Sequence, residues 1–367
     1  MHFLISALIV LFSASTAIAV LHAQPQRKNV DSVSVTYYPN GRRESETPWR
    51  NGMKDGVEII YYRTGAVESE TPYTEGKRNG VEMIYHDNGK RWYQTPYRDD
   101  RKTGVEVTYY ESGKIESETR HQNGVREGME VFYYESGQKE SQTPWMNGKR
   151  HGVKIFFTEK GLKRSETPYV DDQKEGVETA YYESGRVMST TPWKAGHKQG
   201  TETVSYESGS IWSSTEYVDD HKEGVGIGYY ESGKKQSATP WRGDKKSGTE
   251  IVYYEGGRKW YETEYREGKK DGSKIFYFEN GRTERQMTYQ NDRKIGVEVA
   301  FHLNGKKKCE TPYDDDVKHG LETSYHESGK KAAEVPFNRG KEDGAVKVWD
   351  ERGTLTVTMW RNGVIQR

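Results

Sequence analysis

The stretch GVEIIYYRTGAVESETPY, residues 56–73, places two runs of β-prone residues on either side of Gly65. β-Branched and aromatic residues favour strands, whereas glycine favours turns. A polar loop, residues 74–79, separates this stretch from the next glycine, Gly80. The stretch therefore predicts a β-hairpin followed by a loop.

The same pattern recurs every 24 residues along the chain. Turn glycines equivalent to Gly65 run from Gly41 to Gly353, and a second glycine series runs from Gly56 to Gly344. Fourteen units fit this period. Most units end near an aromatic residue such as Tyr73, and only in the last unit is this residue, Trp360, one position earlier than the period requires. A hairpin cannot bury a face alone, so each unit must be stabilised by its neighbours. We predict an all-β fold, an elongated, twisted antiparallel meander of about 28 short strands built from 14 tandem hairpin repeats.

The composition agrees with thin β-structure. Hydrophobic residues make up 32% of the 367 residues and charged residues 31%. This apolar content is too low for a large central core. The 27 Tyr and 9 Trp nevertheless argue against disorder. The formal net charge is zero, which does not suggest a nucleic-acid partner. The one cysteine, Cys309, can form no intramolecular disulfide and occupies a position where serine is usual, so we interpret it as an inert substitution.

The N-terminus has a different chemistry from the repeats. Residues 3–20 are almost wholly apolar or small, and Ala17–Ala19 and Leu21–Ala23 both offer small-x-small cleavage patterns. We predict a signal peptide over residues 1–23, a short linker over 24–32 and a single continuous repeat domain over 33–367. An uncleaved anchor helix is the alternative. No later segment is apolar enough to span a membrane, so we expect a secreted, periplasmic or cell-envelope protein.

The turn type follows from the first unit, where Pro39, Asn40 and Gly41 occupy the turn. A type I′ turn needs positive φ at both central residues, which proline cannot adopt. We predict a type I turn in which the glycine is left-handed and forms a bulge. In the unit around Gly113, this turn places Tyr110 opposite Lys114 and Tyr109 opposite Ile115. Continued alternation places Val107 opposite Ser117 and Val105 opposite Thr119.

This register sorts the side chains onto two faces. One predicted face is apolar and carries Val105, Val107, Tyr109, Ser117 and Thr119 with an aromatic residue at the far end of the unit. The other is wetter and carries Glu106, Tyr110, Glu116 and Glu118. Glutamates should then face each other in four pairs: Glu58 with Glu70, Glu106 with Glu118, Glu298 with Glu310, and Glu322 with Glu334. We interpret these pairs as a solvated face, with divalent-cation binding as the alternative.

Proline occupies one repeat position in nine units: Pro48, Pro72, Pro96, Pro144, Pro168, Pro192, Pro240, Pro312 and Pro336. Proline cannot donate a ladder hydrogen bond. We therefore predict that pairing stops near this point and that each strand is only about five to seven residues long.

The blocks Tyr109–Lys114 and Thr71–Gly80 resemble the MORN-repeat variant found in proteins often labelled YwqK-type antitoxins. The resemblance covers about residues 33–363. It implies an elongated antiparallel sheet without catalytic machinery and a role in protein or lipid association. An antitoxin that neutralises a partner toxin by binding is the alternative function, although an export signal does not suit a cytoplasmic antitoxin.

The sequence contains no recognisable catalytic, cofactor or metal-binding constellation. His86, His302 and His326 share a repeat position where tyrosine is usual, which indicates aromatic substitution. The glycines of Gly224-Val-Gly226-Ile-Gly228 precede a strand and no helix, so they do not form a phosphate loop. Acidic pairs such as Asp99–Asp100 and Asp171–Asp172 lie in the loops next to lysines, and we interpret them as locally neutralised.

The aromatic row at the far end of the units is the candidate binding site. Its members are Trp49, Tyr73, Tyr97, Trp145, Tyr169, Trp193, Tyr217, Trp241 and Tyr265. The row either forms the core that stacks repeat on repeat or stays partly open to a ligand. Trp92, Trp212 and Trp260 are predicted on the opposite, wetter face, where exposure would favour binding. We expect a non-enzymatic scaffold with a protein partner, or with an envelope lipid or glycan surface.

Overall fold

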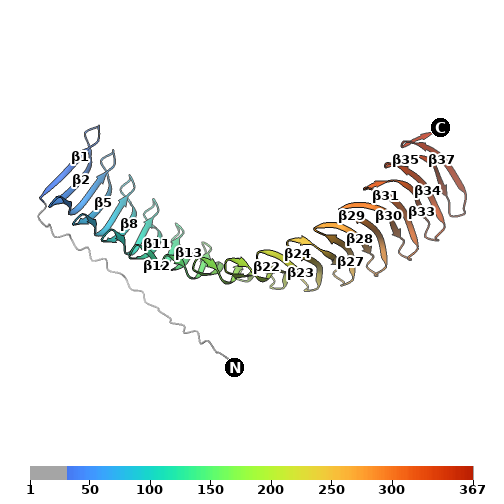
Figure 1. Cartoon of the computed structure of the whole chain (residues 1–367), viewed down its shortest axis with the longest axis horizontal. Coiled ribbons are helices and arrows are strands. Elements are labelled where there is room, and N and C mark those ends of the chain that lie inside the picture. Colours follow the sequence, from blue (N-terminus) through green and yellow to red (C-terminus); the bar gives the residue numbers. More distant parts are fainter. Residues whose placement is uncertain (1–30, 367) are drawn as a thin grey trace, which may run out of the picture.

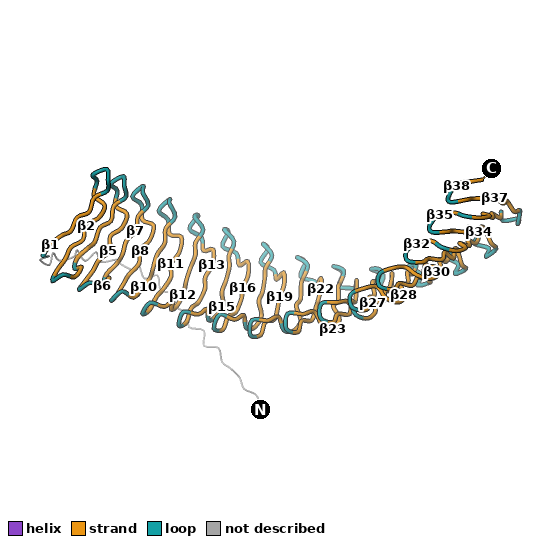
Figure 2. Tube along the Cα trace, turned by 45° about the horizontal axis from the view of Figure 1, so that its top comes forward, coloured by secondary structure: helices purple, strands orange, loops and turns teal. Residues whose placement is uncertain are grey.

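The computed structural model describes residues 31–366, which form a single elongated, curved sheet with no helix (Figure 1). The predicted signal peptide and most of the linker lie outside the described residues. The 38 strands pair antiparallel in chain order and so form an open meander whose twist is visible along the trace (Figure 2). None of residues 31–366 belongs to a helix that could cross a membrane. The all-β prediction is therefore confirmed.

In chain order the strands are β1 (Ser32–Tyr37), β2 (Arg43–Arg50), β3 (Met53–Lys54), β4 (Gly56–Tyr61), β5 (Val67–Thr74), β6 (Lys77–Arg78), β7 (Gly80–Tyr85), β8 (Arg91–Arg98), β9 (Arg101–Lys102), β10 (Gly104–Tyr109), β11 (Ile115–Gln122), β12 (Val125–Tyr133), β13 (Lys139–Met146), β14 (Lys149–Arg150), β15 (Gly152–Phe157), β16 (Lys163–Val170), β17 (Gln173–Lys174), β18 (Gly176–Tyr181), β19 (Val187–Lys194), β20 (His197–Lys198), β21 (Gly200–Ser205), β22 (Ile211–Val218), β23 (His221–Tyr229), β24 (Lys235–Arg242), β25 (Lys245–Lys246), β26 (Gly248–Tyr253), β27 (Lys259–Arg266), β28 (Lys269–Tyr277), β29 (Thr283–Gln290), β30 (Arg293–Phe301), β31 (Lys307–Asp314), β32 (Val317–Lys318), β33 (Gly320–Tyr325), β34 (Lys331–Asn338), β35 (Lys341–Glu342), β36 (Gly344–Trp349), β37 (Leu355–Arg361) and β38 (Val364–Gln366). They make fourteen hairpins followed by the short β38.

The predicted type I turn is present. In the first hairpin the Gly41 N–H donates to the Tyr38 carbonyl at 2.9 Å, and the Tyr38 N–H donates to the Arg42 carbonyl at 2.8 Å. Gly41 has φ of +80°, whereas Pro39 and Asn40 do not have positive φ. The glycine is therefore the left-handed residue that closes the turn and forms the bulge.

The predicted register holds next to the turn and is wrong further along the strands. Tyr109 pairs with Ile115 as expected, but Thr108 pairs with Ser117, which leaves Glu116 without a partner. This second bulge shifts the pairing by one residue, so that Val107 lies opposite Glu118. The same shift recurs in the other units up to β34. Because side chains alternate, one residue of slip moves each partner to the other face.

Each proline interrupts the ladder to the next unit without ending its own strand. Pro48 lies inside β2 and pairs with Val33, yet β2 pairs with the next unit only on either side of the proline, through β3 and β4. The nine prolines coincide with the nine places where the next strand is divided in two. Four units have Arg120, Glu216, Glu264 or Thr288 in place of the proline. The strand that follows each of these units is undivided: these strands are β12, β23, β28 and β30. The missing proline N–H therefore determines where the ladder breaks.

The loops between units are tight two-residue turns. Asn51 and Gly52 both have positive φ, at +50° and +75°, and Arg50 pairs directly with Met53. This is the backbone of a type I′ turn, which favours Asn, Asp and Gly. The acidic pairs occupy the same positions: Asp171 and Asp172 have φ of +48° and +71°, and an Asp172 carboxylate oxygen accepts the backbone N–H of Arg150 in the preceding unit at 3.0 Å. The loop aspartates therefore shape the turns and link neighbouring units.

Candidate binding faces

Direct cross-strand partners define the two faces of the sheet. Glu58 lies opposite Thr71 and Gly56 lies opposite Tyr73, so this glutamate, threonine and aromatic residue share one face. Val57 lies opposite Pro72 and Ile59 opposite Glu70, so these residues share the other face. We call the first the ladder face and the second the valine face, and we use each name for the equivalent residues of every unit.

The most buried row in the protein is a line of threonines on the ladder face. Their exposed fractions are 9% or less: Thr47, Thr71, Thr95, Thr119, Thr143, Thr167, Thr191, Thr239, Thr263 and Thr311. A sheet with no second layer cannot bury a side chain beneath another element. The short threonine side chains are buried because longer neighbours on the same face cover them.

In several units these neighbours form a hydrogen-bonded cluster around the threonine. In the unit at β18, one Glu178 carboxylate accepts the Thr167 hydroxyl at 3.0 Å, the Lys174 ammonium at 2.8 Å and the Trp193 indole N–H at 2.9 Å. The threonine–glutamate bond recurs at 2.8–3.3 Å in six other units. In these units the buried polar groups therefore satisfy each other. The Thr263 hydroxyl, in a unit that has Lys274 instead of the glutamate, is buried without a partner among the residues that the structure describes.

Cations and aromatic rings alternate along the same face. A lysine or arginine lies over the ring of the following unit at 4.0–5.2 Å in eleven pairs: Lys54 over Tyr73, Arg78 over Tyr97, Arg126 over Trp145, Arg150 over Tyr169, Lys174 over Trp193, Lys198 over Tyr217, Lys222 over Trp241, Lys246 over Tyr265, Lys270 over Tyr289, Lys294 over Tyr313 and Lys318 over Phe337. Each such contact contributes about 0.5–1 kcal/mol where it is partly exposed. The row therefore links unit to unit along the array.

The predicted aromatic row lies within this stack. Tyr97 and Tyr217 are buried, at 8% and 9% exposed. The other seven predicted members are half-buried: Trp49, Tyr73, Trp145, Tyr169, Trp193, Trp241 and Tyr265. The structure thus brings the nine residues together on one face, where cations of the described part of the chain that sequence reasoning missed lie over eight of the nine rings, all except Trp49. Those cations recur every 24 residues just before the second glycine series, which is the signal that could have found them.

Trp92, Trp212 and Trp260 lie on the ladder face, so their predicted placement on the opposite face is wrong. Trp260 contacts the ring of Tyr261 at 5.3 Å between centroids, and Tyr261 contacts Phe276 at 5.5 Å. Lys274, which occupies the glutamate position of its unit, lies over both Tyr261 and Phe276. The three tryptophans occupy the bulged position that Glu116 has in its unit, and they are 41%, 50% and 43% exposed.

The predicted glutamate pairs do not exist. Glu58 lies opposite Thr71 and Glu70 lies opposite Ile59, so the two glutamates are on opposite faces. The same holds for the predicted pairs that begin at Glu106, Glu298 and Glu322. Within residues 31–366 no three His, Cys, Asp or Glu side chains are grouped so that they could hold a metal ion. The cause is the second bulge, which separates the two carboxylates by one residue.

The second glutamate series instead accepts tyrosine hydroxyls on the valine face. Glu118 accepts the Tyr133 hydroxyl at 2.8 Å, and Glu70 accepts Tyr85 at 2.8 Å. Burial, followed by the hydrogen bond to the carboxylate, raises the pKa of Tyr85 and of Tyr133 to about 12. The glutamate bond is the first cause for Tyr181 and Tyr325, whose pKa values also rise to about 12.

We expect these tyrosines to make the array sensitive to alkali. Their pKa is 10.0 in the unfolded chain and about 12 in the folded one, so their stabilisation is complete below pH 10 and is lost as the pH rises to 12. Urea midpoints should therefore fall over this range, in step with tyrosinate absorbance. Lysines lose charge over the same range, so Tyr133→Phe is the control, because it should reduce the fall. A fall equal to that of the wild type would contradict the role of the tyrosine.

The histidines at the tyrosine position make the bond that tyrosine makes elsewhere. The Tyr110 hydroxyl donates to the Tyr133 carbonyl of the next unit at 2.6 Å. His302 Nε2 lies 2.8 Å from the Tyr325 carbonyl, and His326 Nε2 lies 2.9 Å from the Trp349 carbonyl. Because a carbonyl only accepts, Nε2 carries the proton in both rings. Aromatic substitution is thus the role of His302 and His326, while His86 stacks on Trp92 with its Nε2 unpartnered.

Cys309 is half-buried, with its Sγ 3.3 Å from the Thr311 hydroxyl. Burial raises the pKa of the thiol, so less of it is the reactive thiolate. The inert interpretation of this cysteine therefore agrees with the structure.

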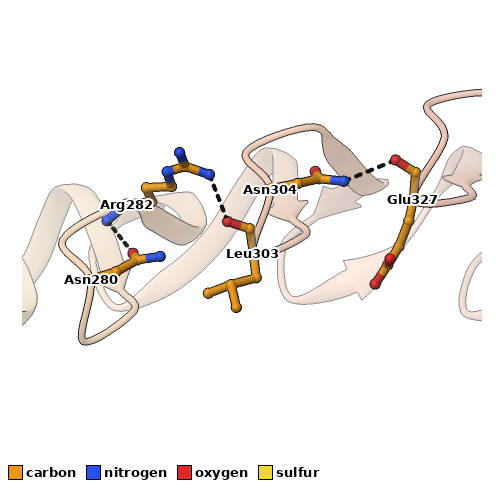
Figure 3. A pocket seen from close by; sticks show the side chains of 5 residues that line it. All are labelled: Asn280, Arg282, Leu303, Asn304 and Glu327. Atoms are coloured by element: carbon orange, nitrogen blue, oxygen red, sulfur yellow. Dashed lines mark hydrogen bonds between the residues drawn. The ribbon is translucent and has the colours of Figure 1, made fainter.

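The turns at the other end of the hairpins hold a hollow lined by Asn280, Arg282, Leu303, Asn304 and Glu327 (Figure 3). The Arg282 guanidinium donates to the Leu303 carbonyl at 3.0 Å, and the Asn304 amide donates to the Glu327 carbonyl at 2.9 Å (Figure 3). Equivalent basic residues make the same bond at Lys114, Arg186 and Arg258. The hollow is therefore the space between two turns that are tied together by side chains.

The valine face presents a row of exposed aliphatic residues at one repeat position. Its exposed members, between 42% and 53% accessible, are Val33, Val81, Met129, Val153, Val177, Val225, Val297 and Leu321. Each of them lies opposite the proline of its hairpin. A row of this length is an extended apolar surface, which is the feature that marks an interaction site on a soluble protein.

Five of the eight basic residues beside this row pair with a glutamate of the same strand. Lys259 pairs with Glu262 at 2.6 Å, and Lys307 and Lys331 pair with Glu310 and Glu334 at 2.5 Å. Arg43 and Lys163 form equivalent pairs with Glu46 and Glu166. The valine face therefore combines an apolar row with basic residues of which most are paired.

Seven stretches of the chain match the family model described as MORN repeat variant: residues 54–75, 78–99, 102–123, 126–147, 174–195, 270–291 and 318–339. These units are MORN repeats of the variant type. Each matched stretch begins at the cation of the ladder face and runs past the aromatic position of the following unit. Seven of the fourteen units therefore belong to a repeat family that generally forms scaffolds without catalytic machinery. No curated protein matches the chain.

Similar solved structures come from toxin complexes. One is titled "Crystal Structure of TcdB2-TccC3-Cdc42", with 11% identity and a TM-score of 0.17 over 90% of this chain and 20% of that one. Another is a structure of the Photorhabdus luminescens Tc holotoxin pore, with 10% identity and a TM-score of 0.17 over 90% of this chain and 18% of that one. The MORN array spans about a fifth of those chains. At these TM-scores the likeness carries no argument about function.

Proposed function

We propose that the MORN array is an exported, non-catalytic scaffold that binds a protein partner along its valine face. The exposed aliphatic row carries this proposal. Burying the exposed half of one valine side chain contributes roughly 1 kcal/mol, so a single unit binds nothing tightly. Several equally spaced contacts add through effective concentration. Affinity should therefore depend on the number of units that a partner covers.

The charge pattern favours a protein over an anionic lipid surface. Lipid headgroups attract unpaired lysines and arginines beside an apolar surface. On the valine face five of the eight basic residues at this repeat position are paired with glutamates, as at Lys259 and Lys307. A protein partner with an apolar strip needs no such charge. Export is proposed from the apolar N-terminus and its two cleavage patterns, which suit a partner in the envelope or outside the cell.

The test is capture from an envelope extract by the chain that begins after residue 23. We expect a partner that is lost when Val177 and Val225 are replaced by lysine, because a charge desolvated in an apolar contact is costly. Both side chains are about half exposed, at 53% and 52%, so the fold should survive. Glu183→Lys, at an 81% exposed turn residue, is the control and should keep the partner. Equal capture by the Val177/Val225 variant, or capture only from cytoplasm, would contradict the proposal. One toxin-like partner at fixed stoichiometry would favour the antitoxin alternative.

A further inference from the structure

One unit of the ladder face has no side chain at the glutamate position. In the unit that follows β22, Gly226 occupies the position that Glu178, Glu202 and Glu250 occupy in nearby units. The residues that bond to that glutamate elsewhere are all retained, as Thr215, Lys222 and Trp241. We call this position, where these three donors face Gly226 instead of a carboxylate, the vacant rung.

The three donors lie around the empty position and have no acceptor there. A Cβ built on Gly226 would lie 3.0 Å from the Trp241 indole nitrogen and 3.6 Å from the Thr215 hydroxyl oxygen. The Lys222 ammonium lies 4.8 Å over the Trp241 ring, which is the place of the equivalent lysine in the complete units. Across residues 31–366 no side-chain hydrogen bond joins the Thr215 hydroxyl or the Trp241 N–H to an acceptor, and no carboxylate pairs with Lys222.

Two further observations indicate that the rung is open to a ligand. Thr215 is half-buried, whereas the other threonines of its row are buried, so the missing glutamate has uncovered it. Gly228, on the same face of the same strand, also lacks a side chain where other units have residues such as Ile60 or Phe156. The backbone of Gly226 needs no glycine, because its φ is outside the left-handed region. The loss of the side chain therefore has no cause in the backbone.

We propose that the vacant rung binds the carboxylate of a glutamate side chain from a partner protein. The complete units show what fits: a glutamate carboxylate that accepts one hydroxyl, one ammonium and one indole N–H at 2.8–3.0 Å. A hydroxyl, an ammonium and an indole N–H are all donors, and the ammonium also carries a positive charge, so an anionic acceptor satisfies them better than a neutral one and a cation does not satisfy them. The rung lies on the ladder face, so this inference stands or falls separately from binding along the valine face.

The experiment follows the indole N–H of Trp241 by NMR in the chain without residues 1–23. The nine tryptophans give few indole signals, and Trp241→Phe assigns the relevant one. We expect N-acetyl-glutamate amide to shift this signal saturably with a dissociation constant on the order of millimolar. N-acetyl-glutamine amide, which has the same shape without charge, should not shift it. No shift, or an equal shift with both probes, would overturn the proposal.

Two variants test the site itself. Gly226→Glu supplies the carboxylate from the chain, so the shift by the glutamate probe should be lost. Lys222→Met keeps the aliphatic stem over Trp241 and removes the ammonium, so it should weaken binding at least tenfold even if Gly226→Glu folds poorly. A probe shift that persists unchanged in either folded variant would overturn the proposal.

Discussion

Gly80→Ala is expected to destabilise its part of the array by about 3 kcal/mol, whereas Gly296→Ala is expected to cost about 1 kcal/mol. The two glycines occupy the same repeat position, and both have positive φ, at +132° and +72°. A Cβ at Gly80 would lie 2.6 Å from Cγ of Pro72, which belongs to the backbone-fixed proline ring. A Cβ at Gly296 would meet nothing within 4 Å, because Thr288 occupies the position at which nine other units have proline.

Urea unfolding of both variants, with hydrogen exchange of the amides in β6, β7 and β8, measures the difference. The additional substitution Pro72→Thr should recover part of the loss at Gly80, since it removes the clash and leaves only the strained φ. Gly256→Ala is the neutral control, because Gly256 has neither positive φ nor a neighbour within 4 Å. Equal losses at Gly80 and Gly296 would show that backbone strain alone requires the glycine.

The sequence predicted the repeat, the hairpin and the turn because each depends on one residue type at one position. Pro39 excluded a type I′ turn, and the period placed the same turn in every unit. The prolines also indicated correctly that the ladder is interrupted, although β2 continues past Pro48. What proline removes is one donor toward the next unit, and a single missing bond divides the neighbouring strand without ending its own.

The second bulge could not be predicted in the same way. A bulge of this kind needs no glycine, and its residue is Glu116 in one unit and Trp92 in another. One unpaired residue was enough to exchange the partners of Val107 and to place Glu106 on the same face as Thr119. The predicted cross-strand partners beyond the turn were therefore wrong, while the repeat, the hairpin and the turn were confirmed.

The identity of the core was also hidden in the composition. Apolar residues were expected to be the most buried, yet Val177 is 53% exposed and Thr143 only 3%. In a single-layer sheet no second element covers the valines, so side-chain length on the same face decides burial. The long Glu, Lys and Trp side chains cover the short threonines between them. A row of strictly spaced threonines flanked by such residues is the sequence pattern that indicates this core.

Removing the Glu178 carboxylate is expected to destabilise its unit by about 2 kcal/mol. Glu178→Ala leaves the Thr167 hydroxyl, the Lys174 ammonium and the Trp193 N–H without their shared acceptor. Exposed ion pairs usually contribute only about 0–1 kcal/mol, but the Glu178 side chain is 27% exposed and accepts three bonds at once. The loss should therefore exceed that of a surface pair.

Glu178→Gln separates the charge from the hydrogen bonds. Glutamine keeps an acceptor oxygen but not the attraction to Lys174, so its loss should fall between that of the alanine variant and the wild type. Glu183→Ala, at an 81% exposed residue of the nearby turn, should not change stability measurably. Hydrogen exchange in β17, β18 and β19, together with urea unfolding, measures the effect. A loss at Glu178 no larger than at Glu183 would mean that the rings and cations hold the units together without the carboxylate. The natural unit at Gly226, which lacks this carboxylate, would then be as stable as its neighbours. The network of donors around Glu178 instead indicates that the Gly226 unit is less stable than its neighbours, so its amides should exchange faster.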